Sequence, residues 1–529
     1  MKKRSLSALL LGALLAAPGL AQDFNVSRVA SNNDWNFYGQ SNGIAAYSLA
    51  STSCNVGNQV VIWNDNIDQA PVIAQNLFRI TPDGQFYQLG YSWLKDGFCA
   101  INENTCGSCQ NTNCDTLGIG CADTYSAGLN DGVNGVAKWQ INATVGAWPS
   151  SWAGPSGPLP IRGRLQVPAD EVGDDNSTYI AEIQYVSEED HMAGNARNNQ
   201  SWRRVQFAGA GINNPSNVGA TQINDPAIFA WKVDYPDVNL QELVVANEGG
   251  PGVNGYIFVG SKATDIGGGL FRYDYVVHNL NSDRSVGSFG LTVPGDITNV
   301  TARHVDHHSG SPWGNDDWTF TNTSGALLWA TETEAQNANA NAIRWGMANT
   351  YSFVSSGTPT TTTADVGLFK AGSPAALTTE VIVPSNDGCS GGGFTDYCSA
   401  NANSASAGGA VLTANGTPDV AANDLSFLAS NVPANQPGFF LMSEGQTFVP
   451  LFSGSQGNLC VAAPIIRFNG NVLNSGSFGI MQFTVDNTDL PQGTVFQPGD
   501  SWNFQLWYRD VNPGSTSNTT AGINVEFCQ

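Results

Sequence analysis

The chain has 529 residues, of which 41% are hydrophobic, 10% aromatic and only 12% charged. The aromatic content argues against disorder, because disordered chains are rich in charge and poor in aromatic side chains. The 44 acidic and 21 basic side chains give a net charge of −23 at pH 7, which argues against nucleic acid and against an anionic membrane surface as partners. At about 150 residues per domain, the length predicts two to four domains.

The first 21 residues have the pattern of a secretory signal peptide. Residues 2–4 are basic, residues 6–17 form an apolar run, and small residues precede a predicted cleavage near Ala21. The apolar run is too short to span a bilayer, and no later segment of the sequence is long enough either. We therefore expect a protein that is secreted or displayed at the cell surface, without a membrane span.

All ten cysteines follow the predicted cleavage point, so we expect disulfides formed in an oxidising compartment. They fall into two groups separated by the cysteine-free stretch 122–388, and each group is expected to pair within itself. The pairing in the first group is left open, whereas in the second we favour Cys389 with Cys398 and Cys460 with Cys528. A redox or zinc role for the CGSC motif is disfavoured, because no His lies near it. The cysteines are Cys54, Cys99, Cys106, Cys109, Cys114, Cys121, Cys389, Cys398, Cys460 and Cys528.

Short runs of aromatic and β-branched residues, separated by Gly, Asn and Pro, are typical of strands and turns. Residues 77–81 and 85–89 flank a Pro-Asp-Gly turn and predict a hairpin. Stretches with the 3.6-residue period of a helix are nearly absent. The sequence therefore predicts an all-β fold with several β-sandwich or jelly-roll-like domains and disulfide-rich loops. Further strands are predicted over 179–186, 271–277, 479–485 and 502–508.

Changes in composition suggest the domain boundaries. After the signal peptide of residues 1–21, we expect an N-terminal Cys-rich β-domain over 22–215 and a central β-sandwich domain over 216–384. The Gly-, Ser- and Asn-rich tract 385–410 has the composition of a flexible linker. Residues 411–529 then form a C-terminal β-sandwich module.

Three stretches combine rare Trp, Cys and Asn-Gly residues, namely 41–79, 90–126 and 455–510. Together they resemble a group of large, secreted, β-rich proteins of environmental Gram-negative bacteria. The third stretch, SQGNLC followed by GDSWNFQLWYRD, is similar to a recurrent C-terminal β-module of many otherwise different exported proteins. The resemblance implies surface display, sorting or assembly for this module and brings no activity with it.

The hexapeptide 303–308 (RHVDHH) holds three of the five His residues and is the sharpest candidate for a site. In a strand, His304, Asp306 and His308 would alternate onto one face, where two imidazoles and a carboxylate can bind Zn²⁺, Fe²⁺ or Cu²⁺. The carboxylates at 316–317 are in reach across the following loop. Same-face neighbours lie ~6–7 Å apart, so one ion binds all three only if the strand bends. The alternative is a polar edge strand.

Two acidic stretches are candidates for other chemistry. The loop 170–176 offers Asp170, Asp174 and Asp175 as oxygen ligands for Ca²⁺, although a plain turn explains it equally well. The group 188–191 (EEDH) is a candidate for acid–base catalysis on a glycoside, with a solvated turn or a Ca²⁺ site as the alternatives. Calcium and a transition metal are therefore the candidate cofactors.

Aromatic side chains in polar loops are candidates for stacking on sugar rings, although aromatics in β-proteins belong mostly to the core. No nucleophile elbow, phosphate-binding loop, dinucleotide fingerprint or haem motif occurs in the sequence. The candidate carbohydrate-binding residues are Trp148, Trp152, Trp313 and Trp318.

Two functions follow from these patterns. The first is a non-enzymatic extracellular or cell-surface protein of structural, assembly or polysaccharide-binding type, with surface polymers, matrix polymers or its own copies as partners. The alternative is a secreted metal-dependent hydrolase or oxidoreductase acting on extracellular polymers, centred on His304, Asp306 and His308. The low charge, the polar loops and the missing catalytic signatures favour the first.

Overall fold

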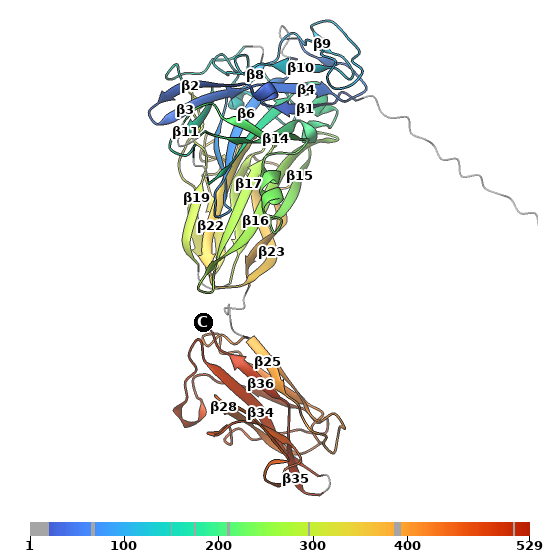
Figure 1. Ribbon diagram of the computed structural model, residues 1–529, viewed down its shortest axis with the longest axis vertical. Coiled ribbons are helices and arrows are strands. Elements are labelled where there is room, and N and C mark those ends of the chain that lie inside the picture. Colours follow the sequence, from blue (N-terminus) through green and yellow to red (C-terminus); the bar gives the residue numbers. More distant parts are fainter. Residues whose placement is uncertain are drawn as a thin grey trace, which may run out of the picture.

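The computed structural model describes residues 21–64, 69–149, 151–173, 176–208, 212–294, 297–385, 393–511 and 514–528. Strands dominate these ranges, and the predicted all-β fold with several sheets is confirmed (Figure 1). No helix in the described ranges is long and apolar enough to cross a membrane. Residues 1–20 of the predicted signal peptide lie outside the description.

The N-terminal part forms several sheets around a core that contains Phe24, Trp63 and Tyr185. Its strands are β1 (Phe24–Val29), β2 (Trp35–Ser41), β3 (Ile44–Leu49), β4 (Ser51–Asn55), β5 (Val61–Ile62), β6 (Val72–Ile80), β7 (Phe86–Tyr91), β8 (Lys95–Asp96), β9 (Thr116–Leu117), β10 (Ala122–Tyr125), β11 (Leu165–Pro168), β12 (Thr178–Val186), β13 (Gln200–Gln206) and β14 (Ser216–Ile223). The main sheet has the order β14-β13-β12-β6-β7, with β8 beside β6, and smaller sheets have the orders β1-β4-β10, β11-β3-β2 and β5-β9.

The predicted hairpin is the β6–β7 pair, in which Ile80 faces Phe86 across an antiparallel ladder. The backbone N–H of Gly84 donates to the carbonyl of Thr81 at 2.9 Å and closes the turn. Gly84 has φ +86°, a conformation that glycine adopts without a Cβ penalty. The Pro-Asp-Gly turn that the sequence predicts is therefore the turn that joins β6 to β7.

The central part consists of two sheets that enclose Tyr275, Trp329 and Phe353. Its elements are α2 (Ile228–Asp234), β15 (Asn239–Gly250), β16 (Val253–Gly267), β17 (Leu270–Asn279), β18 (Val286–Thr292), β19 (Thr298–Arg303), β20 (Thr319–Thr323), β21 (Ala326–Ala330), β22 (Met347–Ser355), β23 (Pro359–Leu368) and β24 (Ala376–Pro384). One sheet has the order β15-β16-β17-β22-β19 and the other β20-β21-β18-β23-β24.

The N-terminal and central parts share a buried apolar cluster. Phe78 of β6, Trp231 of α2 and Phe258 of β16 all belong to it. The predicted boundary between 215 and 216 directly precedes β14, yet β14 pairs with β13 of the N-terminal main sheet. The two parts are therefore packed together across the predicted boundary, and the division into domains stays a prediction.

The C-terminal module is a further set of sheets around a core that contains Phe427, Phe440 and Phe504. Its strands are β25 (Gly393–Cys398), β26 (Val411–Asn415), β27 (Ser426–Ser430), β28 (Pro437–Ser443), β29 (Gln446–Pro450), β30 (Asn458–Val461), β31 (Ile466–Arg467), β32 (Leu473–Asn474), β33 (Met481–Thr484), β34 (Ser501–Asp510), β35 (Thr516–Thr519) and β36 (Gly522–Glu526). The large sheet has the order β25-β36-β34-β28-β31, with β32 beside β28 and β35 beside β34. Smaller sheets have the orders β26-β27-β33 and β29-β30.

Most of the predicted linker 385–410 belongs to this module. Residues 393–398 form β25, which pairs with β36. In the loop that follows, the side-chain amide of Asn403 donates to the carbonyl of Asn431 and to the Tyr508 hydroxyl, at 2.9 Å each. Residues 386–392 lie outside the described residues.

The cysteine-rich loops are held by disulfides, as the sequence predicts. The bonds are Cys54–Cys106, Cys99–Cys114, Cys109–Cys121 and Cys398–Cys460. The favoured pairing of Cys398 with Cys389 and of Cys460 with Cys528 is wrong, because β25 lies close to β30 and the Tyr397 hydroxyl donates to the Cys460 carbonyl at 3.0 Å. Cys528 is also disulfide-bonded, and Cys389 lies outside the described residues.

Candidate functional site

A cleft of about 840 Å³ is the main concave feature considered as a site. It lies where β7, the end strand of the N-terminal main sheet, approaches β19, the end strand of a central sheet. Residues of β11 and β22 complete its walls. Its lining includes many amide and hydroxyl side chains, which are Gln85, Gln88, Gln166, Asn299, Asn315, Thr301, Thr350, Ser352 and Tyr87.

Arg303 is the central cation of the cleft. Its guanidinium donates to Oε1 of Glu171 and stacks over the ring of Tyr87 with 4.6 Å to the ring centroid. Arg79 approaches the other oxygen of Glu171, with Nη1 3.7 Å from Oε2. Burial, together with nearby carboxylates, raises the pKa of Tyr87 to about 12, so this phenol stays neutral in solution near pH 7. Arg303 and Tyr87 thus lie against each other in the lining of the cleft.

Arg272 is a second cation in the lining of the cleft. Its guanidinium bonds Asp83 in the β6–β7 turn and donates from Nε to Oδ2 of Asp274 at 2.9 Å. Gln85 donates to Oδ1 of Asp274 at 2.8 Å and accepts from the Tyr87 hydroxyl at 2.5 Å. The hairpin turn and β17 are therefore joined by a continuous polar network that fixes the shape of this part of the cleft.

His304 lies between two carboxylates. Its Nε2 is 3.5 Å from Oδ1 of Asp306, and its Nδ1 is 3.8 Å from Oδ1 of Asp317. The hydrogen bond from His304 holds the pKa of Asp306 below its ordinary value. Because the two ring nitrogens point in diverging directions, one ion cannot coordinate the imidazole and both carboxylates together.

His308 is turned away from this group into the N-terminal part. Its Nε2 donates to the carbonyl of Tyr91 at 3.0 Å, so its Nδ1 accepts from the Ser309 hydroxyl at 2.9 Å. Burial lowers the pKa of His308 to about 4. The neighbouring His307 is buried against Trp313, and burial lowers its pKa well below its ordinary value.

The geometry expected for the metal site is not formed. β19 ends at Arg303, so residues 304–308 are not a strand and do not alternate onto one face. His304 and Asp306 come together, but both nitrogens of His308 are already hydrogen-bonded to protein groups. Across the described ranges, no group of three or more His, Cys, Asp or Glu side chains is arranged to hold a metal ion.

The acidic stretches have different outcomes. Asp170 lies exposed in a turn after β11, whereas Asp174 and Asp175 of the expected calcium loop lie outside the described residues. The EEDH group forms α1 (Glu188–Met192), where Asp190 is buried and accepts from the backbone N–H of Phe24 at 3.0 Å. His191 bonds the carbonyl of Ala143 at 2.8 Å. Asp190 therefore fastens β1, and His191 fastens the loop that contains Ala143.

Two of the four candidate stacking tryptophans are buried, and the other two are partly exposed. Trp148 and Trp318 are only 9% and 7% exposed, and each indole N–H donates to a backbone carbonyl. Trp152 packs edge-on against Trp148, while Trp313 contacts His307 and the guanidinium of Arg344. Long-range packing therefore covers the rings of Trp148 and Trp318, whereas Trp152 and Trp313 are partly exposed, and carbohydrate binding by these residues stays a prediction.

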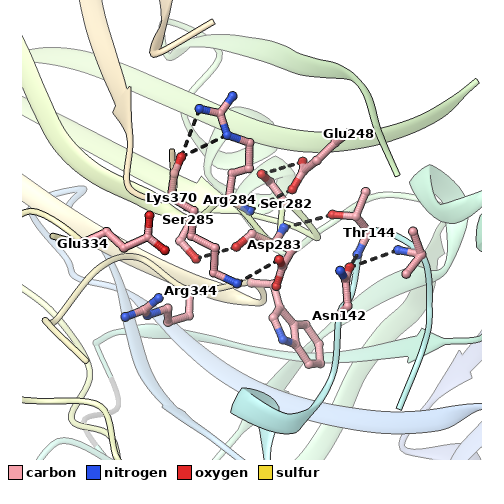
Figure 2. A network of polar contacts seen from close by, with 12 residues as sticks. Asn142, Thr144, Glu248, Ser282, Asp283, Arg284, Ser285, Glu334, Arg344 and Lys370 are labelled. Atoms are coloured by element: carbon pink, nitrogen blue, oxygen red, sulfur yellow. Dashed lines mark hydrogen bonds and ion pairs between the residues drawn. The ribbon is translucent and has the colours of Figure 1, made fainter. Parts of the chain in front are cut away.

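A second pocket of about 390 Å³ lies between the loop 142–145 and the β15–β16 hairpin. Figure 2 shows the network of polar contacts among the residues around it. Arg284 donates there to the carbonyls of Lys370 and Pro374, at 3.0 and 2.7 Å. Oε1 of Glu248 accepts from the backbone N–H of Arg284 at 2.8 Å, and Asp283 pairs with the Lys370 ammonium at 2.8 Å. These charged groups are bonded to protein groups, and Asp283 and Arg284 hold the 370–374 loop to the segment between β17 and β18.

No family model and no curated protein matches the chain. Among solved structures, the chain is similar to the Actinomyces fimbrial adhesin FimA, with 12% identity over 54% of this chain and 96% of that chain and a TM-score of 0.13. It is also similar to the BSP domain of a biofilm-associated protein, with 9% identity over 98% of this chain and 85% of that chain and a TM-score of 0.13. At these TM-scores the similarities carry no argument about function.

Proposed function

We propose that the chain is a secreted, cell-surface or extracellular protein of non-enzymatic type that binds polysaccharide in the cleft between β7 and β19. The cleft itself carries the proposal, since its volume of about 840 Å³ is that of a small-molecule or oligosaccharide site. The disulfides in the cysteine-rich loops of the N-terminal part support an oxidising compartment outside the cytoplasm.

The lining of the cleft suits a ligand rich in hydroxyl groups. A carboxamide presents donors and an acceptor side by side, and a hydroxyl group offers both, so each can bond a sugar hydroxyl in either sense. Gln166 lies on β11, and Asn299 and Thr301 lie on the exposed face of β19. The ring of Tyr87, backed by Arg303, adds an aromatic surface.

Two of the titratable groups that line the cleft, Glu171 and His308, are placed for binding rather than for catalysis. A general acid or base must reach the substrate proton and exchange its own proton during the reaction. Glu171 is paired with Arg303 and Arg79, and the Nε2 proton of His308 is committed to the Tyr91 carbonyl. These contacts hold the groups in fixed roles that position the walls of the cleft.

The test is retention on a panel of immobilised polysaccharides, among them cellulose, chitin, xylan, alginate and dextran. Thr301→Trp places a bulky ring into the cleft from an exposed position of an end strand, so the fold should be preserved. Thr321→Trp, at an exposed position of the end strand β20, is the matched control. Retention of the wild type and the control, with loss in Thr301→Trp, supports the proposal. Equal retention of both variants, or no retention of the wild type on any polymer, contradicts it.

A further inference from the structure

The two ends of the C-terminal module differ in charge. At one end, β34 begins at Ser501, which pairs with Glu526, and Glu526 pairs with Gly393 at the start of β25. We call this end the proximal end. β34 finishes at Asp510, where β35 begins, and this end is the distal tip (Figure 1). The acidic side chains of the loops gather at the proximal end, and they are Asp419, Asp424, Glu444, Asp486, Asp489 and Asp500.

The loops of the distal tip contain no charged residue, and they span 399–410, 431–436, 451–457 and 475–480. Hydrogen bonds bring them together at this end: Ser404 donates to Asp510 at 3.2 Å, and the backbone N–H of Gln456 donates to the Ser517 carbonyl at 2.8 Å. Asp510 itself is buried and also accepts from Asn518 at 3.2 Å. In a chain with a net charge of −23, the tip therefore presents a surface without acidic side chains.

Apolar side chains project from this uncharged surface. Phe478 is 88% exposed, which leaves nearly the whole ring in water. Leu451 and Val511 are each 55% exposed, and Leu451 has φ 51°, a conformation that is unusual for a bulky side chain. Val411 and Ile480 add further exposed aliphatic surface. Together the five side chains expose apolar surface on the order of 500 Å² at this end of the module, within the range of the largest apolar patches of soluble proteins, which are often functional.

We infer that the distal tip docks against the distal tip of a second copy of this chain. Two acidic molecules repel each other, so they approach most easily through the ends that lack acidic side chains. Apolar anchors within a rim of uncharged Asn, Ser and Gly have the composition of a protein interface, whose centre is depleted in charge. A two-fold contact places identical patches together. An area of this size is below the ~800 Å² per partner of a standard interface, so the contact is weak and concentration-dependent.

The same charge pattern disfavours a lipid surface. Segments that lie in the membrane interface combine apolar side chains with Lys and Arg, which attract anionic headgroups. The distal loops contain no Lys and no Arg. Arg509, a cation near this end of β34, lies over the ring of Trp507. This inference concerns the C-terminal module alone and does not depend on polysaccharide binding in the cleft.

The experiment is sedimentation velocity of the full mature chain from about 5 to 500 μM, at low and high NaCl. The wild type is expected to form dimers as concentration rises, and salt should strengthen the association because it screens the repulsion between acidic bodies. Phe478→Asp should raise the dissociation constant at least ~10-fold, since it places two carboxylates in the contact. Because Phe478 is almost fully exposed, the variant should unfold at the same denaturant concentration as the wild type.

Val495→Asp is the matched control, because Val495 is exposed in the proximal loop that precedes β34. It should dimerise like the wild type. A wild type that stays monomeric throughout overturns the inference, as does equal weakening by both substitutions. Flotation with phosphatidylcholine vesicles that depends on Phe478, in a chain that remains monomeric, would replace the second copy with a lipid surface.

Discussion

Replacing His278 by Leu should stabilise the protein. His278 of β17 is fully buried at the junction of the N-terminal and central parts, with its ring 5.9 Å from that of Phe78 and 6.4 Å from that of Phe258. Neither ring nitrogen has a hydrogen-bond partner among the described residues. A buried unpaired polar atom costs about 1–3 kcal/mol, whereas the lost ring contacts are worth about 0.5–1.5 kcal/mol. We therefore expect His278→Leu to gain about 1 kcal/mol at pH 7.

The gain should grow in acid. Burial, followed by the charge of Lys138, lowers the pKa of His278 to about 3, while the unfolded chain takes up a proton near pH 6.5. The wild type therefore loses stability as pH falls below about 6.5, by up to ~1.4 kcal/mol per pH unit from this residue, and the Leu variant does not. At pH 5 the advantage of the variant should be larger by about 2 kcal/mol.

Urea unfolding followed by Trp fluorescence at pH 7 and pH 5 measures both effects. His308→Leu is the informative contrast, because both nitrogens of His308 are hydrogen-bonded and this variant should lose about 1–3 kcal/mol at pH 7. A His278→Leu protein that is less stable than the wild type, or whose advantage is the same at both pH values, would refute the reasoning. It would mean that the imidazole of His278 has a partner that stabilises it.

Two further substitutions test particular contacts. Converting Cys398 and Cys460 to Ser should lower the unfolding free energy of the C-terminal module by about 2–4 kcal/mol, because the disulfide no longer closes a long loop. Non-reducing peptide mapping of the wild type should recover the two peptides linked by this disulfide, and their absence would refute the pairing. Arg284→Met should destabilise the central part by about 1.5–3 kcal/mol, since the carbonyls of Lys370 and Pro374 lose a charged donor. Limited proteolysis should then cut the 370–374 loop faster than in the wild type. An unchanged cleavage rate would show that the contacts of Arg284 drawn in Figure 2 are dispensable.

The strands were predictable because their signals are local. The runs 179–186 and 502–508 fall within β12 and β34, and the hairpin around Gly84 forms as expected. Alternating apolar side chains and turn residues act over a few positions, so a sequence window contains them completely. Because most segments of the sequence carry such strand and turn signals, the all-β class could be predicted from the sequence.

The site was less predictable because its partners are distant in the sequence. His308 is withdrawn from the expected metal group by the carbonyl of Tyr91, more than two hundred residues earlier. Trp318 follows a Gly- and Asp-rich loop that suggests exposure, but its indole is buried and bonded to the Asn341 carbonyl. Asn403 lies in a tract with the composition of a linker, yet its amide binds two groups of the folded module.

The cleft itself illustrates the same limit. Gln166, Thr301 and Thr350 come from β11, β19 and β22, and nothing in their local sequence marks them as neighbours. One partial signal existed, because the polar residues Asn299, Thr301 and Arg303 recur at every second position of a strand-like stretch, and all three line the cleft although a register shift between Thr298 and Thr301 interrupts the regular strand. Which strand would face them depends on how the two parts pack.

Hydrogen–deuterium exchange with a polysaccharide that retains the wild type tests the proposed cleft most directly. Binding in the cleft predicts slower exchange of the backbone amides of β7 and β19, the end strands whose side chains line it, with no such change in Thr301→Trp. Protection confined to the C-terminal module, or to the sheet that contains β20, would contradict polysaccharide binding at this site.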